Sequence, residues 1–368
     1  MFSSSPRYST LTRQVANALE EEIRGGKFKD NLPGERWLAE SMQVSRRTLR
    51  AALELLRQKK VLHPKAKRQH RILNVPAGSA SRPSLRSIGL LLPEPLADMP
   101  PYSAVFFDPL RALLYADGFR LENHIGHSFF SRRPAAALER LIAAFPCDGW
   151  VMPYSSRASQ TWFHARRIPV VIVGSAHEGI DVPYVDVDYR ATARHAAGYL
   201  IGKGHRRLGL IVHEDHPAGD KRTEAGFVEG SRSFAGAGAS TMVFRHGGTM
   251  ADLRRMTERI LRLAEPPTAL LIANPYSYMG VAGLLAEHGV KVPRDLSLLC
   301  RDNDYCLRYM PIEPSRYVCS PEKRARAIYS TLMRALQPGA SDAQAASVLL
   351  MPDLVEGGSV ARITAATQ

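Results

Sequence analysis

The sequence predicts two unlike domains: a small α+β domain with a helix-turn-helix, then a larger two-lobed α/β domain built on parallel doubly wound sheets. Two observations support this division. Apolar residues recur at helical spacing in the first quarter of the chain, whereas short apolar runs alternate with helical segments from residue 87 onward. Residues 1–86 also hold 18 Lys and Arg against 7 Asp and Glu. A chain of 368 residues is long enough for two or three domains with their own cores.

The first domain, expected over residues 1–75, begins with a predicted amphipathic helix from Thr10 to Arg24. The stretch from Leu32 to Leu56 is typical of two helices joined by a tight turn. Ser45 is expected to cap the second helix, because its hydroxyl can accept a backbone N–H of the following turn.

The second of these helices has two distinct faces. Its apolar positions, which share one face, are Leu49, Ala52, Leu53 and Leu56. Arg46, Arg47 and Arg50 point away from that face and lie in the first turn and a half. Side chains at the start of a recognition helix are those that reach base edges and phosphates in a major groove. The pattern therefore favours DNA binding over the alternative, a solvated basic face.

The distribution of charge supports the same interpretation. Residues 1–86 carry a net charge of +11, whereas the remaining 282 residues carry +3. This asymmetry is typical of a nucleic-acid-binding module attached to a nearly neutral body. A basic patch for solubility or for a membrane surface would explain the charge alone, but not the helix-turn-helix beneath it.

A basic segment follows the two helices and lies between the short apolar pieces Val61–Leu62 and Arg71–Leu73. This arrangement predicts a two-stranded wing, with a flexible basic loop as the alternative. The wing side chains expected to lie along phosphates or in a minor groove are Lys65, Lys67, Arg68 and His70.

The helix-turn-helix carries a specific resemblance. Leu32-Pro33-x-Glu35-Arg36-x-Leu38-Ala39, followed by Val44-Ser45-Arg46-x-Thr48-x-Arg50-x-Ala52-Leu53, resembles the winged helix-turn-helix of GntR-family regulators, over roughly residues 8–73. The resemblance implies a winged helix in which Arg36, Arg46 and Arg50 contact DNA. Including neighbours on the same surface, the predicted contacts are Arg36, Ser45, Arg46, Arg47, Thr48 and Arg50. The segment from His63 to Arg71 replaces the Gly-x-Gly-Thr-like hairpin usual in the family.

Residues 76–86 contain Pro, Gly, Ser and Ala without periodicity, so we predict a linker. The second domain is expected over residues 87–368. Its predicted strands cover 88–92, 149–152, 169–173, 208–212, 241–244, 269–272 and 297–300, and its predicted helices cover 105–117, 138–145, 191–203, 223–235, 251–263 and 278–288. Strands that are apolar throughout favour parallel sheets covered on both faces. Their number exceeds one doubly wound sheet, which predicts two lobes.

Several pieces of this domain resemble one family. They are Ile88-Gly89-Leu90-Leu91, Gly204-His205-Arg206-Arg207, Val292-Pro293-Arg294-Asp295-Leu296-Ser297 and Arg301-Asp302-Asn303. They resemble the effector domain of LacI-family regulators, which is periplasmic-binding-protein-like, over about residues 87–360. The resemblance implies a ligand in a cleft between two lobes, at the carboxyl ends of the strands.

The same resemblance implies particular ligand contacts. Tyr102 matches a position that stacks on the ligand, and Asp302 matches an acidic position that accepts hydrogen bonds. Anchoring on Gly226-Phe227 places Thr223 where the family has a clamping arginine, with Arg222 one residue earlier, and we predict that Arg222 takes this role.

One departure bears on the ligand. Asn274-Pro275-Tyr276 stands where the family has Asn-Asp before a helix. A carboxylate is lost and an aromatic ring is gained, which weakens the prediction of a sugar. We predict that Asn274 and Tyr276 contact the effector. The alternatives are that Tyr276 packs in the core and that Asp302 caps a turn.

No signature of catalysis is found: the sequence lacks a Gly-x-Ser-x-Gly elbow, a phosphate loop ending in Gly-Lys-Ser/Thr and a Gly-x-Gly-x-x-Gly after a strand. We therefore predict no enzymatic activity and no cofactor. The run His213-Glu214-Asp215-His216 lacks zinc-protease spacing, and we predict no metal site. The four cysteines, Cys147, Cys300, Cys306 and Cys319, fit a reduced protein.

The expected protein is a cytoplasmic transcriptional regulator, since no apolar run of 18 residues and no signal core is present. Its expected partners are double-stranded operator DNA, a small polar effector for which a sugar is one candidate, and a second copy in a homodimer. Repression is favoured over activation. The alternative is a metabolite-binding sensor or a small-molecule enzyme that uses the two-lobed domain, with vestigial DNA binding.

Overall fold

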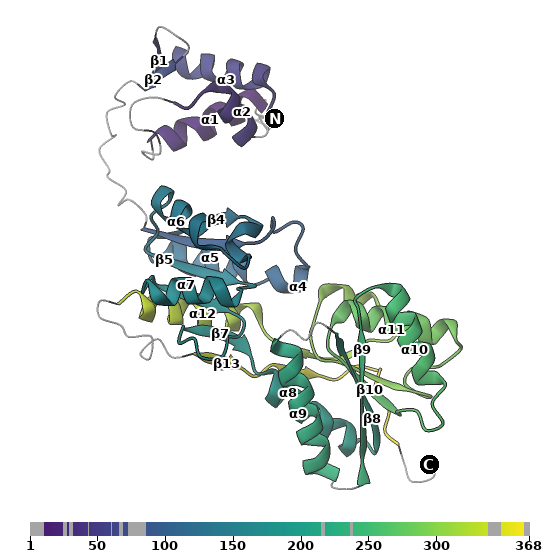
Figure 1. Ribbon diagram of the computed structural model, residues 1–368. Helices are drawn as coiled ribbons and strands as arrows, with labels where there is room; N and C mark the ends of the chain where they lie inside the picture. The colour runs from purple at the N-terminus through teal and green to yellow at the C-terminus, as the bar shows by residue number, and fades with distance from the viewer. Residues whose placement is uncertain are drawn as a thin grey trace, which may run out of the picture. The chain divides into compact units, whose positions relative to one another are not determined.

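The computed structural model describes residues 11–24, 28, 32–42, 44–59, 61–65, 69–72, 86–214, 218–235, 238–337 and 347–363. The chain divides into two compact units, Met1–Leu85 and Arg86–Gln368, which are coloured from purple to yellow along the chain in Figure 1. The predicted linker, apart from Arg86, lies outside the described residues, as do Lys67 and Arg68 of the predicted wing.

The first unit contains three helices and a hairpin. They are α1 (Leu11–Arg24), α2 (Glu35–Ser41), α3 (Arg46–Gln58), β1 (Leu62–Lys65) and β2 (Gln69–Ile72). The hairpin is antiparallel, so the predicted two-stranded wing is confirmed. The predicted cap is also confirmed, because Ser45 Oγ accepts a hydrogen bond of 3.1 Å from the Thr48 backbone N–H.

The core of this unit explains why these segments are helical. The apolar stripe of α3 is buried against Leu19 of α1 and Leu38 of α2, with Leu62 of the hairpin in the same cluster. Burial of one stripe leaves the opposite side of α3 on the surface. The packing therefore fixes which side of α3 faces solvent.

The larger unit has two lobes. The sheet of the first lobe has the strand order β13-β7-β6-β5-β3-β4, and all of its pairs are parallel. Its strands are β3 (Arg86–Leu92), β4 (Phe119–Ile125), β5 (Gly149–Pro153), β6 (Val170–Val173), β7 (Tyr184–Val187) and β13 (Val348–Leu350). Its helices are α4 (Pro101–Ala104), α5 (Phe107–Ala116), η1 (His127–Phe130), α6 (Ala135–Ala144), α7 (Arg157–Ala165) and α12 (Pro321–Ala335). Helices α5 and α12 pack on one face, and α6 and α7 on the other.

The sheet of the second lobe has the strand order β14-β12-β11-β10-β8-β9. Its strands are β8 (Arg207–His213), β9 (Ser240–His246), β10 (Ala269–Ile272), β11 (Ser297–Cys300), β12 (Ser315–Val318) and β14 (Asp353–Val355). Its helices are α8 (Tyr189–Gly202), α9 (Ala218–Ala235), α10 (Met250–Leu261), α11 (Pro275–Glu287) and η3 (Tyr305–Tyr309). Helices α8 and α9 cover one face and α10 and α11 the other, so the predicted doubly wound arrangement is confirmed. Strand β14 is antiparallel to β12, a departure from an all-parallel sheet.

The chain crosses between the lobes three times: from β7 to α8, from β12 to α12, and from β13 to β14. Three crossings, rather than one, tie the two lobes into a single compact unit. Among the helices that the structure describes, none combines the length and apolar character needed to cross a bilayer.

Candidate nucleic-acid interface and effector cleft

The exposed side of α3 carries the predicted DNA contacts. Arg46, Arg47 and Arg50 are all exposed there, and Arg36 is exposed on α2. The side chain of Arg50 is 67% exposed, yet its Nε lies 2.8 Å from Glu35 Oε2, so it is oriented by a residue of α2. Cations at a helix N-terminus are locally unfavourable unless an anion approaches them. The arrangement therefore presents positive charge suited to a phosphate or to a base edge.

The remaining predicted DNA contacts that the structure describes lie at the start of α3 and in the hairpin. The hydroxyls of Ser45 and Thr48 lie 2.8 Å apart at the start of α3, where they form its cap. Lys65 and His70 lie in the hairpin, on β1 and β2. Lys67 and Arg68 fall outside the described residues.

A cavity of about 1340 Å³ lies between the two lobes of the larger unit. Its walls come from the carboxyl ends of strands in both sheets, as expected for open α/β sheets. The first lobe contributes Tyr102 and Asp186, and the second lobe contributes Asn274 and Asp302. The predicted cleft is therefore present, with Tyr102, Asn274, Tyr276 and Asp302 in its lining.

Tyr102 connects the lobes. It lies on α4 of the first lobe, and its backbone N–H donates a hydrogen bond of 3.1 Å to Asp304 Oδ2 of the second lobe. Its Oη accepts a hydrogen bond of 3.2 Å from Asn274 Nδ2, and its ring meets the edge of the Tyr276 ring at 5.8 Å. Burial, reinforced by the nearby Tyr154 and Asp302, raises the pKa of Tyr102 to about 12. The phenol is therefore protonated near neutral pH and retains an O–H donor for a ligand.

Asn274 has a structural task as well. Its Oδ1 accepts hydrogen bonds from the backbone N–H groups of Tyr276 at 2.8 Å and Ser277 at 3.3 Å, which caps α11. Pro275 occupies the first turn, where its missing N–H costs nothing. The cap fixes the Asn274 side chain so that its amide group reaches Tyr102 across the cleft.

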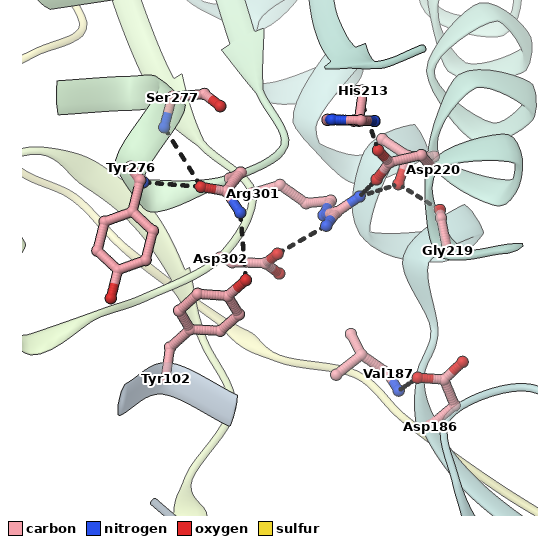
Figure 2. Close-up of polar contacts among 12 residues, drawn as sticks. Tyr102, Asp186, Val187, His213, Gly219, Asp220, Tyr276, Ser277, Arg301 and Asp302 are labelled. Carbon is pink, nitrogen blue, oxygen red and sulfur yellow. Dashed lines mark hydrogen bonds and ion pairs between the residues drawn. The ribbon is translucent and has the colours of Figure 1, made fainter. Parts of the chain in front are cut away.

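A buried polar network in the cleft wall is built on Arg301, a residue that we did not predict. Arg301, which follows β11, is only 7% exposed. Its Nη2 donates to Asp302 Oδ2 at 2.6 Å, and its Nη1 donates to Asp220 Oδ1 at 2.6 Å and to Thr223 Oγ1 at 2.8 Å. The ring of Tyr189 lies 4.3 Å from the guanidinium carbon. Figure 2 shows Arg301 between the two carboxylates.

The charge state of this network follows from its partners. Burial alone would lower the pKa of Arg301, but the carboxylates of Asp302 and Asp220 raise it above its usual value. The guanidinium is therefore charged and holds Asp302 in one orientation. Within the described part of the chain, Arg301 Nε is buried and has no hydrogen-bond partner.

Arg222, the predicted clamp, lies elsewhere. It is on α9, with Nη1 3.7 Å from Oδ2 of Asp186, a residue of the cavity wall. Asp186 also accepts hydrogen bonds from Ser175 Oγ at 2.6 Å and from the Val187 backbone N–H at 2.8 Å. Burial raises the pKa of Asp186 despite these donors. Sequence reasoning missed Asp186 and Asp220 because both depend on contacts between distant segments.

For Arg301, in contrast, the sequence does contain a signal. A charged residue directly after the apolar strand Ser297–Cys300 is a sequence signal for a side chain at the carboxyl edge of the sheet. The resemblance directed attention to its neighbour Asp302 instead.

A histidine and a serine also meet in the cleft wall. His246 Nε2 and Ser277 Oγ are 3.2 Å apart, and His246 Nδ1 accepts a hydrogen bond of 3.1 Å from the Gly248 backbone N–H. Burial lowers the pKa of His246, which favours the neutral ring. Since Nδ1 is an acceptor, the ring proton lies on Nε2 and is donated to Ser277. In this tautomer His246 does not act as a general base toward the Ser277 hydroxyl.

Comparison with known proteins finds similarities in both units. Residues 11–71 match the family model of bacterial regulatory proteins of the gntR family, and residues 197–360 match a periplasmic-binding-protein-like domain. The HTH-type transcriptional regulator AglR of Rhizobium meliloti (strain 1021) is 30% identical over 175 residues, covering 46% of this chain and 48% of that protein. The HTH-type transcriptional repressor CytR of Escherichia coli (strain K12) is 28% identical over 136 residues, covering 37% of this chain and 40% of that protein. The chain thus matches less than half the length of each.

Solved structures agree on the fold. A regulatory protein of the LacI family from Chloroflexus aggregans superimposes with a TM-score of 0.65 at 20% identity, covering 75% of this chain and 99% of that one. A LacI family transcriptional regulator from Arthrobacter sp. FB24, in complex with lactose, gives a TM-score of 0.60 at 20% identity, with coverage of 75% and 99%. These similarities establish the two-lobed fold.

Fold and site together define a modular class, in which a helix-turn-helix unit is joined to a two-lobed unit with a central cleft. Residues 11–71 are similar to the gntR family of bacterial regulatory proteins and residues 197–360 to periplasmic-binding-protein-like domains, and the larger unit shares its two-lobed fold with the solved structures above.

Proposed function

We propose that this protein is a sequence-specific DNA-binding transcriptional regulator, acting as a repressor, whose affinity for an operator is set by a small polar effector in the cleft. DNA binding is assigned to residues 1–75, and effector binding and dimerisation to residues 87–368, joined by a linker over 76–86. The observation that carries the proposal is the exposed cluster of Arg46, Arg47 and Arg50 on a helix of gntR type. The name of one relative, the repressor CytR, favours repression.

The lining of the cleft favours a ligand with both hydroxyl groups and acceptor oxygens. Carboxylates such as Asp302 and Asp304 accept hydrogen bonds from hydroxyls, whereas the protonated hydroxyl of Tyr102 donates one. The ring edges of Tyr102 and Tyr276 supply an apolar surface beside these groups. A sugar fits this combination, and the lactose complex of the Arthrobacter protein has the same fold.

Control of DNA binding follows from the position of Tyr102. This residue links the first lobe to Asn274 and Asp304 of the second, so a ligand that contacts these groups favours one arrangement of the lobes. An effector shifts an equilibrium only by the difference in its affinity for the two states. A homodimer would pass the lobe movement to two recognition helices bound at the half-sites of a two-fold operator.

The proposal is tested by selecting binding sites from random duplex DNA with the full-length protein and measuring affinity by fluorescence anisotropy. We expect enrichment of a two-fold sequence and a protein that sediments as a dimer. A duplex affinity that is independent of sequence, at moderate ionic strength, would refute specific binding. Turnover of a cleft ligand by the protein would favour the enzymatic alternative.

A further inference from the structure

A cluster of side chains of metal-binding types lies in the first lobe of the larger unit, among residues outside the cleft lining. It consists of Glu122 and His124 on β4 and Cys147 just before β5, and their ligand atoms lie within 4.8 Å of one another. Strand β3 runs between β4 and β5, and its Gly89 pairs with both Glu122 and Trp150. The cluster therefore joins two segments that are distant in sequence and that lie on either side of β3, near one edge of the sheet.

His124 occupies an unusual position for a polar side chain. Its ring is 9% exposed and lies 5.0 Å from the Phe145 ring and 5.3 Å from the Trp150 ring. Within the described part of the chain, its Nε2 has no hydrogen-bond partner. Buried polar atoms in proteins almost always have a partner, so this nitrogen requires an explanation. Burial lowers the pKa of His124, which keeps the ring neutral and able to bind a metal.

The other two groups complete a donor set. Cys147 is half-buried, and burial raises the pKa of its thiol, so the sulfur is protonated without a metal. The Glu122 side chain is 33% exposed, with Oε1 3.7 Å from Arg120 Nη1, and one of its carboxylate oxygens belongs to the cluster. Thiolate, imidazole and carboxylate together are ligands typical of zinc.

We propose that Glu122, His124 and Cys147 form a site for Zn²⁺ or a divalent ion of similar softness. The ion would bond to one carboxylate oxygen, one imidazole nitrogen and the sulfur, with water as the fourth ligand. Binding releases the Cys147 proton to solvent and involves no redox change. Tetrahedral zinc separates its ligand atoms by roughly 3.5 Å, so the three groups must converge by about an ångström. The proposal does not depend on the proposed function.

No spacing motif predicts the whole site, because Glu122 and His124, which share one side of strand β4, supply only two ligands and Cys147 lies in a separate segment. Metal binding would link β4 to the entry of β5 across β3. Arg86 at the start of β3 is already paired with Asp148 of that entry at 3.0 Å. The ion would therefore stiffen the sheet edge at which the larger unit begins.

The test uses full-length protein that has been reduced and treated with a chelator, then titrated with Co²⁺ and Zn²⁺. We expect one equivalent of Co²⁺ to produce a thiolate-to-cobalt charge-transfer absorption, which Zn²⁺ abolishes, and we expect Zn²⁺ to raise Tm. Cys147→Ser should remove the absorption, and His124→Gln should weaken binding by at least tenfold. The matched controls Cys306→Ser and His127→Gln should bind as the parent does.

Two outcomes would overturn the proposal. One is the lack of a thiolate band at stoichiometric Co²⁺ in a protein whose circular dichroism shows that it is folded. The other is a band that survives in Cys147→Ser. Because Cys147→Ser changes a single atom, it keeps the test decisive even if His124→Gln fails to fold.

Discussion

Arg301 donates a hydrogen bond of 2.8 Å to the hydroxyl of Thr223, on the helix that the resemblance expects to carry a clamping arginine. The guanidinium in the cleft wall therefore comes from the end of β11 rather than from α9. It is bound on both sides by carboxylates, Asp220 and Asp302, whereas Arg222 makes one longer contact with Asp186. Arg301 is thus the better candidate for the residue that organises the effector site.

This difference predicts unequal costs for two arginine substitutions. Arg301→Met leaves two carboxylates without their buried partner and should lower the free energy of unfolding by about 3–5 kcal/mol. Arg222→Met removes a partly exposed contact of 3.7 Å and should cost about 1 kcal/mol or less. Urea denaturation of the full-length protein, followed through the unfolding of the larger unit, measures both. Equal losses would contradict the central position of Arg301.

Asp302 gives a functional prediction. Asp302→Ala removes a carboxylate of the cleft wall and a partner of Arg301, so it should abolish the response of DNA binding to effector. The proposed DNA-binding surface lies on the separate N-terminal unit, so affinity for DNA without effector should be retained. Anisotropy titrations with and without ligand measure both properties. An unaltered effector response would show that Asp302 is not a ligand contact.

The arginines at the start of α3 lead to a prediction about DNA affinity. Arg46→Ala and Arg50→Ala should each weaken operator binding by about 1–3 kcal/mol if these side chains contact bases. Arg57→Ala is the matched control, since Arg57 lies at the other end of α3 and pairs with Glu54 at 2.9 Å. A control variant that loses as much affinity as the other two would indicate a general charge effect.

The Gly-His-Arg-Arg piece gives a stability prediction with a built-in control. Gly204 has φ +98°, and a Cβ there would lie 2.3 Å from the carbonyl oxygen of Ile363. Gly204→Ala should therefore lower the free energy of unfolding by at least about 1–3 kcal/mol. Gly202→Ala, on α8 with nothing within 4 Å of the added atom, should stabilise by up to about 1 kcal/mol. Chemical denaturation compares the two, and similar losses would contradict the strain at Gly204.

Asp186 predicts a pH dependence. Burial raises its folded-state pKa above the usual value of 3.8, so ionisation of Asp186 destabilises the folded protein. The contribution of Asp186 to the free energy of unfolding is therefore most favourable below pH 3.8, and this stability is lost as the pH rises through the raised pKa. Asp186→Asn should therefore raise Tm at pH 7, with a gain that shrinks toward pH 4. The exposed Asp181→Asn is the control, and a gain that persists unchanged in acid would refute the interpretation.

The sequence predicted the strands that are buried on both faces better than the edge and short polar strands. Strands β8, β10 and β11 are continuous apolar runs because helices cover both sides, and they were predicted at or near their observed bounds. Strand β4 was missed because it is an edge strand with exposed polar residues, including Arg120. Strand β12 was missed because it is short and contains Arg316, whose side chain is buried by bonds to Asn303 and a backbone carbonyl.

The candidate sites followed a similar rule. Residues that a local motif or a family resemblance could identify, such as Asn274 and Asp302, lie in the cleft wall. The Asp220–Arg301 pair and the Glu122–His124–Cys147 cluster join segments far apart in sequence, and no local pattern reveals them. Long-range contacts of this kind are fixed only by the assembled sheets.

The most direct measurement is an anisotropy titration of the full-length protein against its selected operator duplex, with and without a saturating ligand found by thermal-shift screening. Regulation by an effector predicts sequence-specific binding and at least a fivefold change in Kd when ligand is present, a typical lower bound for allosteric coupling. The same Kd with and without a ligand that demonstrably occupies the cleft would contradict it.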